Sequence, residues 1–333
     1  MNRVVNIYPN FANRGGAQDV VLQLAEKLNF ETKPIVLTET NIDNIVTEYK
    51  ERAVFIPFNK KNILKLHDGN TVFLSHHRKN TTKLVLINLF LKKKLPLIHI
   101  AHNTFNTLKW FSRFPNKNIA VSNAVKDNLI EYFKVPEQNV KVIFNGMTDK
   151  YCPDTSYKDN KEINILLPGR ICPVKQQIEI ANRLKESIPE YVHISFAGAG
   201  EDVDELKKII ANSKQLNYVG FLNIAENIHS YDYVCLFSKN EGLPLSLIEG
   251  CMFGKPLITN DIKAVLDVNK EGETGFVFKN FEELSNGLKN IPTRESDEYK
   301  RLSANARKRY EQLFTEDRMI SQYKQVITEL INN

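Results

Sequence analysis

The sequence lacks the features that mark several large classes of protein. No stretch of its 333 residues approaches the run of about 20 apolar residues that a membrane-spanning helix needs. The N-terminus has no secretory signal pattern, because Met1–Arg3 leads directly into an apolar segment that begins at Val4. There is no repeat of solenoid period and no low-complexity tail. We therefore expect a globular, cytoplasmic protein.

Cysteine and histidine are scarce, and neither is spaced for a metal site. The four cysteines lie far apart in the sequence, so a disulfide or zinc framework is not expected and we interpret them as small buried side chains. The paired histidines, His76-His77 and His99 with His102, lack the i,i+4 spacing of a helical zinc motif. On a strand, positions 99 and 102 would point to opposite faces. We therefore expect no metal ion.

The dinucleotide-binding pattern G-x-G-x-x-G is also missing after the first predicted strand. The chain instead has Gly15-Gly16-Ala17-Gln18 at the start of an amphipathic helix. The main sequence evidence for a nicotinamide-dependent enzyme is therefore missing. Two adjacent glycines allow a ligand to approach the backbone in front of the helix amides. A simple tight turn explains the same pair about as often.

Charge is distributed unevenly along the chain. Residues 1–155 contain 22 Lys and Arg against 13 Asp and Glu, whereas the remainder contains 23 against 26. This asymmetry suggests that the first half meets an anionic surface. Its apolar run Leu84–Leu91 is flanked by cations, which fits either a core helix with solvated ends or a membrane-surface helix. Nucleic acid is not expected, because aromatic residues are not interleaved with the cations in a recognisable binding module.

Short apolar strands alternate with helical patterns in both halves of the chain, which predicts two α/β domains with parallel sheets. We expect two Rossmann-like domains, residues 1–150 and 151–333, whose sheets face an interdomain cleft. The boundary falls in the polar segment 148–161, and the stretch from Asp297 to Ile331 reads as one or two terminal helices. The predicted strands are Val4–Tyr8, Lys33–Leu37, Ala53–Ile56, Val72–Ser75, Leu97–Ala101, Asn118–Val121, Val140–Ile143, Ile163–Leu167, Val192–Ala197, Leu216–Val219, Tyr233–Phe237, Pro256–Thr259 and Gly275–Val277.

The segment from Glu241 to Glu249 is the most informative in the chain, because two carboxylates bracket a loop-to-helix turn. Pro244 suits the first helical position, and the amides that follow it are unpaired donors suited to phosphate. Glu241 and Glu249 can each accept hydrogen bonds from sugar hydroxyls. An ordinary amphipathic helix start with solvated glutamates explains this segment equally well when it is considered alone.

Two cations follow the first strand of the second half. Arg170 and Lys175 stand at the carboxyl end of that strand, where a bidentate guanidinium and an ammonium can converge on a diphosphate. Considered alone, two solvated surface cations are the commoner explanation. The segment around Glu241 would supply the other half of a diphosphate-sugar site.

Taken together, these segments resemble the retaining glycosyltransferases of family 4, which have the two-domain GT-B fold. The resemblance covers nearly the whole chain, and the segments come in the family's order. In the first half they are Gly15–Gln18, Ala101–Asn103, Val121–Val125 and Val142–Met147. In the second half they are Gly169-Arg170 with Lys175, Gly198–Gly200, Gly220-Phe221, and Glu241–Pro244 with Glu249 and Gly254–Pro256.

The resemblance implies a role for each matching residue. Arg170 and Lys175 would hold the donor diphosphate, and Leu245 would supply a phosphate-binding amide. Glu249 would bind the ribose hydroxyls, and Glu241 would bind the transferred sugar near its reacting carbon. The other substrate-contacting residues that it implies are Leu222 beside the base, His102 in the sugar and acceptor pocket, and Gly15, Gly16, Gln18, Gly242, Leu243 and Pro244.

The implied reaction is the retaining transfer of a hexose from a nucleotide-diphosphate sugar, with UDP favoured, to a hydroxyl of a glycan or lipid-linked acceptor. The acceptor would attack on the face from which the nucleotide leaves, and the departing phosphate would take its proton. No cofactor and no metal is expected, because cations and helix amides stabilise the leaving charge. Bacterial surface polysaccharide synthesis is the expected setting, with an anionic membrane surface as a further partner.

Two alternatives stay open, and three positions depart from the family's pattern. A nucleotide-sugar epimerase would have the same fold, and a catalytically silent nucleotide- or carbohydrate-binding subunit would keep the same site. Gln176 stands where glycine is usual, Lys263-Ala264 replaces a glycine pair, and Leu266-Asp267 replaces Pro-Glu. Gln18 in place of glutamate is a milder change. These departures leave the donor sugar open.

Overall fold

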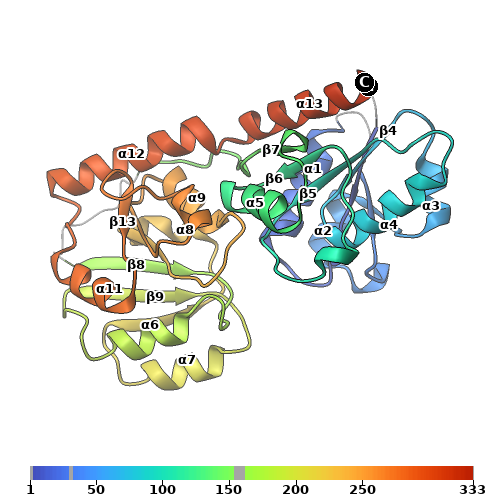
Figure 1. The fold of residues 1–333 in the computed structure, drawn as a ribbon. Coiled ribbons are helices and arrows are strands. Elements are labelled where there is room, and N and C mark those ends of the chain that lie inside the picture. The colour runs from blue at the N-terminus through green and yellow to red at the C-terminus, as the bar shows by residue number, and fades with distance from the viewer. Residues whose placement is uncertain (1–2, 30–32, 154–161, 333) are drawn as a thin grey trace. The chain divides into compact units, whose positions relative to one another are not determined.

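The computed structural model describes residues 3–29, 33–153 and 162–332. The chain forms two compact units, each of which contains one sheet (Figure 1). Unit 1 consists of Met1–Gly146 and Asp317–Asn333, and unit 2 consists of Met147–Glu316.

Unit 1 contains a parallel sheet of seven strands in the order β3-β2-β1-β4-β5-β6-β7. The strands are β1 (Arg3–Ile7), β2 (Ile35–Thr38), β3 (Val54–Pro57), β4 (Thr71–Ser75), β5 (Leu97–Ala101), β6 (Asn118–Ala120) and β7 (Val140–Val142). Its helices are α1 (Gly16–Lys27), α2 (Thr47–Arg52), α3 (Lys60–Leu66), α4 (Arg78–Leu89), α5 (Asn123–Asp127) and, from the end of the chain, α13 (Glu316–Asn332).

The unit 1 sheet is buried on both faces, which explains why its strands are almost uniformly apolar. Helices α3 and α4 pack on one face, where Ile63 and Leu84 join the side chains of β1 and β4. Helices α1 and α2 pack on the other face through Val21, Leu22 and Tyr49. The order of the strands reverses between β1 and β4, and the carboxyl ends of these strands are therefore the expected place for a ligand.

Unit 2 contains a parallel sheet of six strands in the order β10-β9-β8-β11-β12-β13. The strands are β8 (Ile163–Pro168), β9 (Val192–Ala197), β10 (Leu216–Gly220), β11 (Tyr233–Leu236), β12 (Leu257–Thr259) and β13 (Gly275–Val277). Its helices are α6 (Gln177–Leu184), α7 (Val203–Ile210), α8 (Ile224–Asn227), α9 (Leu245–Met252), α10 (Lys263–Leu266), α11 (Phe281–Gly287) and α12 (Asp297–Leu313).

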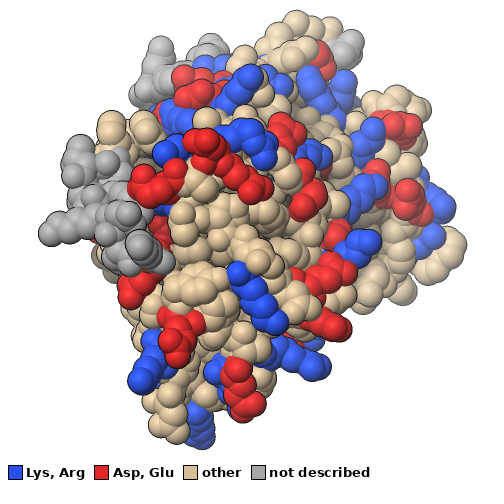
Figure 2. Space-filling model, turned by 90° about the vertical axis from the view of Figure 1, so that its left-hand side faces the viewer, with Lys and Arg blue, Asp and Glu red and all other residues tan. Residues whose placement is uncertain are grey.

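Helical periodicity explains how unit 2 closes its core. In α6 the buried positions Gln177, Ile180, Ala181 and Leu184 follow the i, i+3, i+4, i+7 pattern of a one-sided helix. Helices α6 and α7 cover one face of the sheet in Figure 1, and α9 and α12 lie on the other. Acidic and basic side chains are intermixed on the side that carries α11 and α12 (Figure 2).

The predicted fold class of two parallel α/β sheets is confirmed. Each of the thirteen predicted strands is present in the described chain, with ends shifted by at most two residues. The units differ from the predicted ranges at the C-terminus, because Asp317–Asn333 groups with unit 1 and not with the second half. The physical reason is that α13 packs on unit 1 through contacts such as that of the Met319 sulfur with the Gly146 amide. Residues 154–161, part of the predicted boundary, lie outside the described residues.

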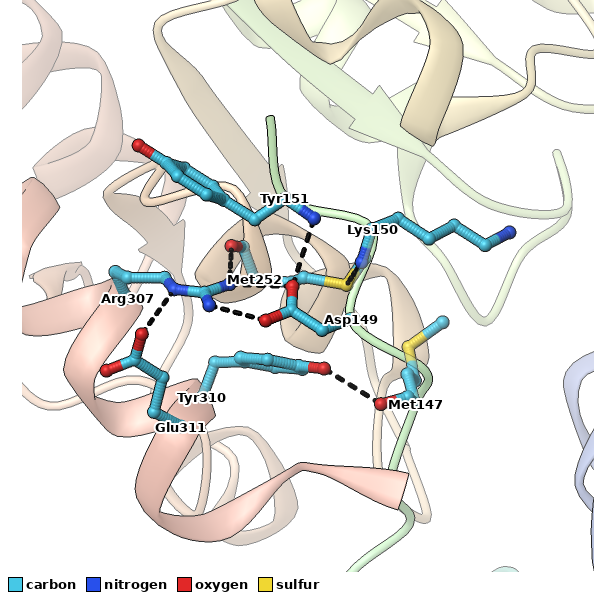
Figure 3. Close-up of polar contacts among 8 residues, drawn as sticks. All are labelled: Met147, Asp149, Lys150, Tyr151, Met252, Arg307, Tyr310 and Glu311. Atoms are coloured by element: carbon cyan, nitrogen blue, oxygen red, sulfur yellow. Dashed lines mark hydrogen bonds and ion pairs between the residues drawn. The ribbon is translucent and has the colours of Figure 1, made fainter. Parts of the chain in front are cut away.

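The start of unit 2 is anchored on α12 by one arginine (Figure 3). Arg307 pairs with the Asp149 carboxylate, with Nη1 at 2.9 Å from Oδ1 and Nη2 at 2.5 Å from Oδ2. The same guanidinium donates to the Met252 carbonyl at 2.7 Å and to Glu311 at 2.8 Å. Tyr310 adds a hydroxyl bond to the Met147 carbonyl at 2.8 Å. Residues 147–151 are thus held against α9 and α12 by charge-assisted bonds.

The apolar run that was predicted to be either a core helix or a membrane-surface helix forms the second half of α4 and the two residues after it, and it has features of both. Leu84 is fully buried in the unit 1 core, but Leu86, Leu89 and Phe90 are 46%, 67% and 87% exposed. No helix among the described residues is long and apolar enough to cross a membrane.

Candidate functional site

The candidate site of unit 2 lies at the carboxyl edge of its sheet, where the strand order reverses between β8 and β11. Gly169 and Arg170 follow β8, and the loop that carries Glu241 follows β11. Open parallel sheets bind ligands at this switch point because the two neighbouring loops leave it in opposite directions. The residues that the sequence predicts for the donor therefore belong to neighbouring strands.

Two glycines, which have no side chain, allow the loops after β8 and β9 to touch. A Cβ on Gly198 would lie 2.0 Å from the Gly169 carbonyl oxygen, and one on Gly200 would lie 2.0 Å from the carbonyl oxygen of Ile171. Both distances are far below van der Waals contact, so only glycine fits at these positions. The Ile171 amide donates to the Ala199 carbonyl at 3.0 Å. The backbone around Arg170 is thus fixed by its neighbour loop.

A tight turn connects Arg170 to α6. The Lys175 amide donates to the Cys172 carbonyl at 2.9 Å, and Gln176 has the left-handed conformation, with φ of 56°. Glycine adopts this conformation without strain, whereas glutamine is strained in it.

Gln177 is a positioning residue that sequence reasoning missed. Its side chain is 1% exposed, and its amide nitrogen donates to the Arg170 carbonyl at 2.9 Å. The side-chain oxygen accepts from the Cys172 amide at 3.4 Å. A polar residue on the buried face of α6 is the signal that could have revealed it, because such a group requires partners.

The loop that carries Glu241 is held from both sides. The Lys239 amide donates to the Val174 carbonyl at 2.8 Å, which attaches this loop to the turn after β8. The Asn260 side chain, 8% exposed, donates to the Ser238 carbonyl at 2.7 Å and so ties the loop to the end of β12. Asn260 was also missed by sequence reasoning.

The structure brings Lys175 and Glu241 together as an ion pair. Lys175 Nζ lies 2.5 Å from Glu241 Oε1, and the two side chains are only 21% and 10% exposed. Arg170 is exposed at the same edge of the sheet. Two residues predicted for different parts of the donor are thus direct partners.

The start of α9 differs in detail from the sequence prediction. Pro244 is the N-cap, with ψ of 107°, and Leu245 is the first helical residue, so the helix begins one position later than predicted. The Leu247 amide donates to the Pro244 carbonyl at 3.2 Å. Helix geometry leaves the amides of Leu245 and Ser246 without an intrahelical acceptor. These two amides can meet an anionic ligand.

The other predicted donor-side residues lie on α9, in the loop before it and after β10. Gly242 and Leu243 are buried in front of it, and Glu249 is half-buried on α9. Leu222 follows β10 and is half-buried, next to Phe221, whose ring is 72% exposed. Lys263 and its neighbours form the short helix α10 after β12.

Unit 1 has a pocket of about 330 Å³ at the carboxyl ends of its strands. His102 lines it together with Ala17 of the predicted glycine loop. The other lining residues are Tyr8, His76, His77, Arg78, His99, Ile100, Ala101, Asn103, Phe105, Phe114, Asn128, Leu129 and Phe133. Two of the predicted segments of the first half therefore share one pocket.

A hydrogen-bonded chain of three side chains ends at His102 in this pocket. His76 Nδ1 lies 2.8 Å from His102 Nε2, and His76 Nε2 lies 2.8 Å from Asn6 Oδ1. Because Asn6 Oδ1 can only accept, His76 donates from Nε2 and accepts at Nδ1 the proton on His102 Nε2. His102 then has a lone pair on Nδ1.

Burial keeps both members of the histidine pair neutral. It lowers the pKa of His102 to about 4, and it lowers the pKa of His76 well below the usual value, with the neighbouring His102 adding to the effect. A neutral imidazole can accept a hydrogen bond from a hydroxyl. This fits the predicted pocket role of His102, whereas His76 and Asn6 were not predicted.

His99 lines the same pocket as His102, contrary to the expectation that the two would point to opposite faces. The reason is that β5 ends at Ala101, so His102 lies beyond the regular alternation. His99 Nδ1 lies 2.7 Å from the hydroxyl oxygen of Thr81, and burial lowers its pKa to about 3. Among the described residues, no group of three or more His, Cys, Asp or Glu side chains could hold a metal ion.

The glycine loop begins α1 beside this pocket. Gly15 is the N-cap, and its amide donates to the Tyr49 hydroxyl at 3.3 Å. Gln18 is 9% exposed and donates to the Asn13 carbonyl at 3.2 Å, so its side chain closes the loop on itself. Gly16 is the first helical residue, and its backbone remains accessible to a ligand.

Comparison with known proteins gives matches across the chain. The family model described as Glycosyltransferase Family 4 matches residues 14–150, and the model Glycosyl transferases group 1 matches residues 153–309. The O-antigen biosynthesis glycosyltransferase WbnH of Escherichia coli is 25% identical over 233 residues, which cover 68% of this chain and 61% of WbnH. The match thus spans about three fifths of the length of such curated relatives.

Solved structures share the whole fold. A glycosyltransferase from Rickettsia africae superposes with a TM-score of 0.83 at 18% identity, covering 100% of this chain and 99% of that one. HepE of Anabaena, solved in complex with UDP, also has a TM-score of 0.83, at 15% identity over 98% and 100% of the two chains. At this level of identity the likeness establishes the fold, which is that of GT-B glycosyltransferases.

Proposed function

Because the chain belongs to the glycosyltransferases of family 4, as the two models that together match residues 14–150 and 153–309 show, we propose that it transfers a hexose from a UDP-sugar. The acceptor is a hydroxyl of a glycan or lipid-linked glycan in bacterial surface polysaccharide synthesis. WbnH, an O-antigen enzyme by name, supports this setting, and the complex of HepE with UDP supports the choice of nucleotide.

The observation that carries the donor assignment is the convergence of three segments at one edge of the unit 2 sheet. The turn 169–175, the loop 238–243 and the first amides of α9 meet there, and the Lys175–Glu241 contact of 2.5 Å joins two of them. Cations, amides and a carboxylate at one edge match the three parts of a sugar diphosphate. Unit 2 therefore binds the donor, and unit 1 holds the acceptor.

Each side chain then has one task. Arg170 and Lys175 hold the diphosphate with the amides of Leu245 and Ser246, and they stabilise the charge that grows on the leaving phosphate. Glu241 binds hydroxyls of the transferred sugar, and Glu249 binds those of the ribose. The departing phosphate accepts the proton of the attacking hydroxyl, so no protein base is required.

The experiment is to incubate the protein with a panel of nucleotide sugars and to follow release of the nucleotide. Arg170→Ala and Lys175→Ala should each lower turnover by about a hundredfold or more, since removing one donor from such a site costs that much. Donor affinity should fall far less. Arg183→Ala, on the exposed face of α6, is the matched control and should leave turnover unchanged.

Normal turnover in both site variants would refute the assignment. The product distinguishes the alternatives, because an epimerase would return a changed nucleotide sugar without an acceptor. A silent binding subunit would bind the donor without releasing nucleotide under any condition.

A further inference from the structure

Asn6 and His76 have no task in the proposed reaction, although both are buried in unit 1 and His76 lines its pocket. Together they form the series of hydrogen bonds that leads to His102. Polar side chains that are removed from water need partners, so the pairing of these two is itself expected. The series ends at a ring that also lines the pocket, and the pairing therefore affects the surface that a ligand meets.

The rings of His76 and His102 meet edge to edge. Their centroids are 5.1 Å apart and their planes are inclined by only 17°, while His76 Nδ1 lies 2.8 Å from His102 Nε2. The N–H and the lone pair of an imidazole lie in the plane of its ring, so nearly coplanar rings in edge contact form a well-aligned hydrogen bond. Asn6 Oδ1 accepts from His76 Nε2 at 2.8 Å, which places the proton of His102 on its Nε2. In the described part of the chain, His102 makes no other hydrogen bond.

His99, which lines the same pocket, is fixed by a second set of contacts. Its Nδ1 lies 3.2 Å from the Ser75 carbonyl oxygen, which can only accept, so the proton of His99 is on Nδ1. Burial lowers the pKa of His99 to about 3 and that of His102 to about 4, which leaves each ring with a single proton at neutral pH. The remaining nitrogens, Nδ1 of His102 and Nε2 of His99, are therefore both hydrogen-bond acceptors.

We propose that Asn6 and His76 are positioning residues that hold His102 with its proton on Nε2, so that its Nδ1 accepts a hydrogen bond from an uncharged sugar hydroxyl. A hydroxyl can donate to this lone pair, whereas the ionised carboxylate of an acidic sugar has no proton to donate. The ligand group at His102 is thus a hydroxyl and not an acidic substituent. This inference rests on the proposed function, because the hydroxyl belongs to one of the sugar substrates.

The position of the proton on His102 can be measured by NMR on protein that contains ¹⁵N-labelled histidine. In the parent protein the proton should be on Nε2 of His102 and on Nδ1 of His99. Asn6→Leu removes the acceptor of the His76 Nε2 proton, and an unpaired N–H is costly in a buried place. His76 should then carry its proton on Nδ1 and donate to His102 Nε2, which moves the proton of His102 to Nδ1.

Asn29→Leu is the matched control for this measurement. Asn29 bonds to the amide and carbonyl of Val4 at the start of β1 and to the Ala25 carbonyl, at 2.8–3.0 Å. The variant loses these three hydrogen bonds at the opposite end of the strand that carries Asn6. It should be destabilised but should leave the proton of His102 on Nε2.

The consequence for the reaction is measured as kcat/KM, with the nucleotide sugar of the panel that releases nucleotide fastest. Asn6→Leu and His76→Leu should each lower kcat/KM about threefold to tenfold, which is the effect of losing one hydrogen bond between neutral groups. His76→Gln keeps one donor and one acceptor, so it should lose less than about twofold. Asn29→Leu should also stay within about twofold of the parent protein.

A proton on Nδ1 of His102 in the parent protein would overturn the proposal, and this spectrum decides even if a variant does not fold. An unchanged proton position in folded Asn6→Leu, or equal losses in His76→Leu and His76→Gln, would also overturn it. The NMR measurement needs no substrate. A parent protein with the expected proton position that releases nucleotide from no nucleotide sugar would therefore refute the proposed function alone.

Discussion

Neutralising Glu241 should strengthen the binding of UDP while it lowers sugar transfer. Glu241 holds the ammonium of Lys175 at 2.5 Å. UDP contains the ribose and the diphosphate but not the transferred sugar. Under the proposed assignment Glu241 therefore makes no contact with UDP and competes with it for Lys175. The substitution Glu241→Gln removes the competing charge and keeps the shape of the side chain.

The size of the effect follows from the burial of the pair. With exposures of 21% and 10%, the contact is more protected from water than a surface salt bridge, whose value is about 0–1 kcal/mol. Hydrogen bonds to charged groups contribute about 1.5–3 kcal/mol, but glutamine still accepts one bond from Lys175. We therefore expect a gain of about 1–2 kcal/mol, or about 5-fold to 30-fold in UDP affinity.

Isothermal titration with UDP measures this directly. Lys175→Met should weaken UDP binding, because it removes the cation that the phosphate would pair with. Glu179→Gln is the matched control, since Glu179 pairs with Lys239 at 3.6 Å in the same unit but both side chains are exposed. It should change UDP affinity by less than about twofold. If Glu241→Gln binds UDP with the same affinity as the parent protein or with a lower one, the reasoning is wrong. Lys175 then does not have to leave Glu241 when the diphosphate binds.

Three further predictions concern stability. Burial lowers the pKa of His99 to about 3, so below pH about 6.5 the unfolded chain takes up a proton that the folded chain does not. The free energy of unfolding should fall towards acid by up to about 1.4 kcal/mol per pH unit for this residue. Urea titrations at several pH values measure this, and the unfolding free energy of His99→Gln should depend less steeply on pH than that of the parent protein. An unchanged dependence on pH would contradict the reasoning. Gln176→Gly should stabilise unit 2 by about 0.5–1 kcal/mol, because glycine accepts the left-handed backbone; a lower melting temperature would contradict this. Arg307→Ala should lower the free energy of unfolding in urea by about 2 kcal/mol, because it breaks three charge-assisted contacts. Replacement of the exposed neighbour, Lys308→Ala, should lower it by less than about 0.5 kcal/mol. Equal losses would show that the contacts of Arg307 contribute nothing to stability.

The strands could be predicted from the sequence because each is a short apolar run between polar turns. Parallel strands that are buried on both faces are continuous apolar runs, without alternation of polar and apolar residues. This pattern distinguishes them from the amphipathic helices of the same chain. The loop positions at the carboxyl edge of unit 2 followed from the same reasoning, since Arg170 directly follows β8 and Glu241 follows β11. That the loops after β8 and β9 touch followed less directly, because this contact depends on Gly198 and Gly200.

Helix packing at the end of the chain could not be predicted in the same way. Helices α12 and α13 have similar amphipathic patterns and are separated by only two residues, yet they belong to different units. Amphipathicity shows that a helix packs on something, but it does not identify the partner. The Met319 contact with Gly146 that attaches α13 to unit 1 joins residues 173 apart.

The hydrogen-bonded series Asn6, His76 and His102 shows which feature of the sequence pointed to the unit 1 pocket. Its members are 70 and 26 residues apart, and they meet because β1, β4 and β5 are neighbours in the sheet. Asn6 and His76 are 0% and 3% exposed within or directly after strands that are otherwise apolar. A buried polar side chain in such a place is costly unless it is hydrogen-bonded, so its presence indicates a partner on a neighbouring strand. Polar residues that interrupt an apolar strand near its carboxyl end are thus better pointers to this pocket than the spacing of the histidines.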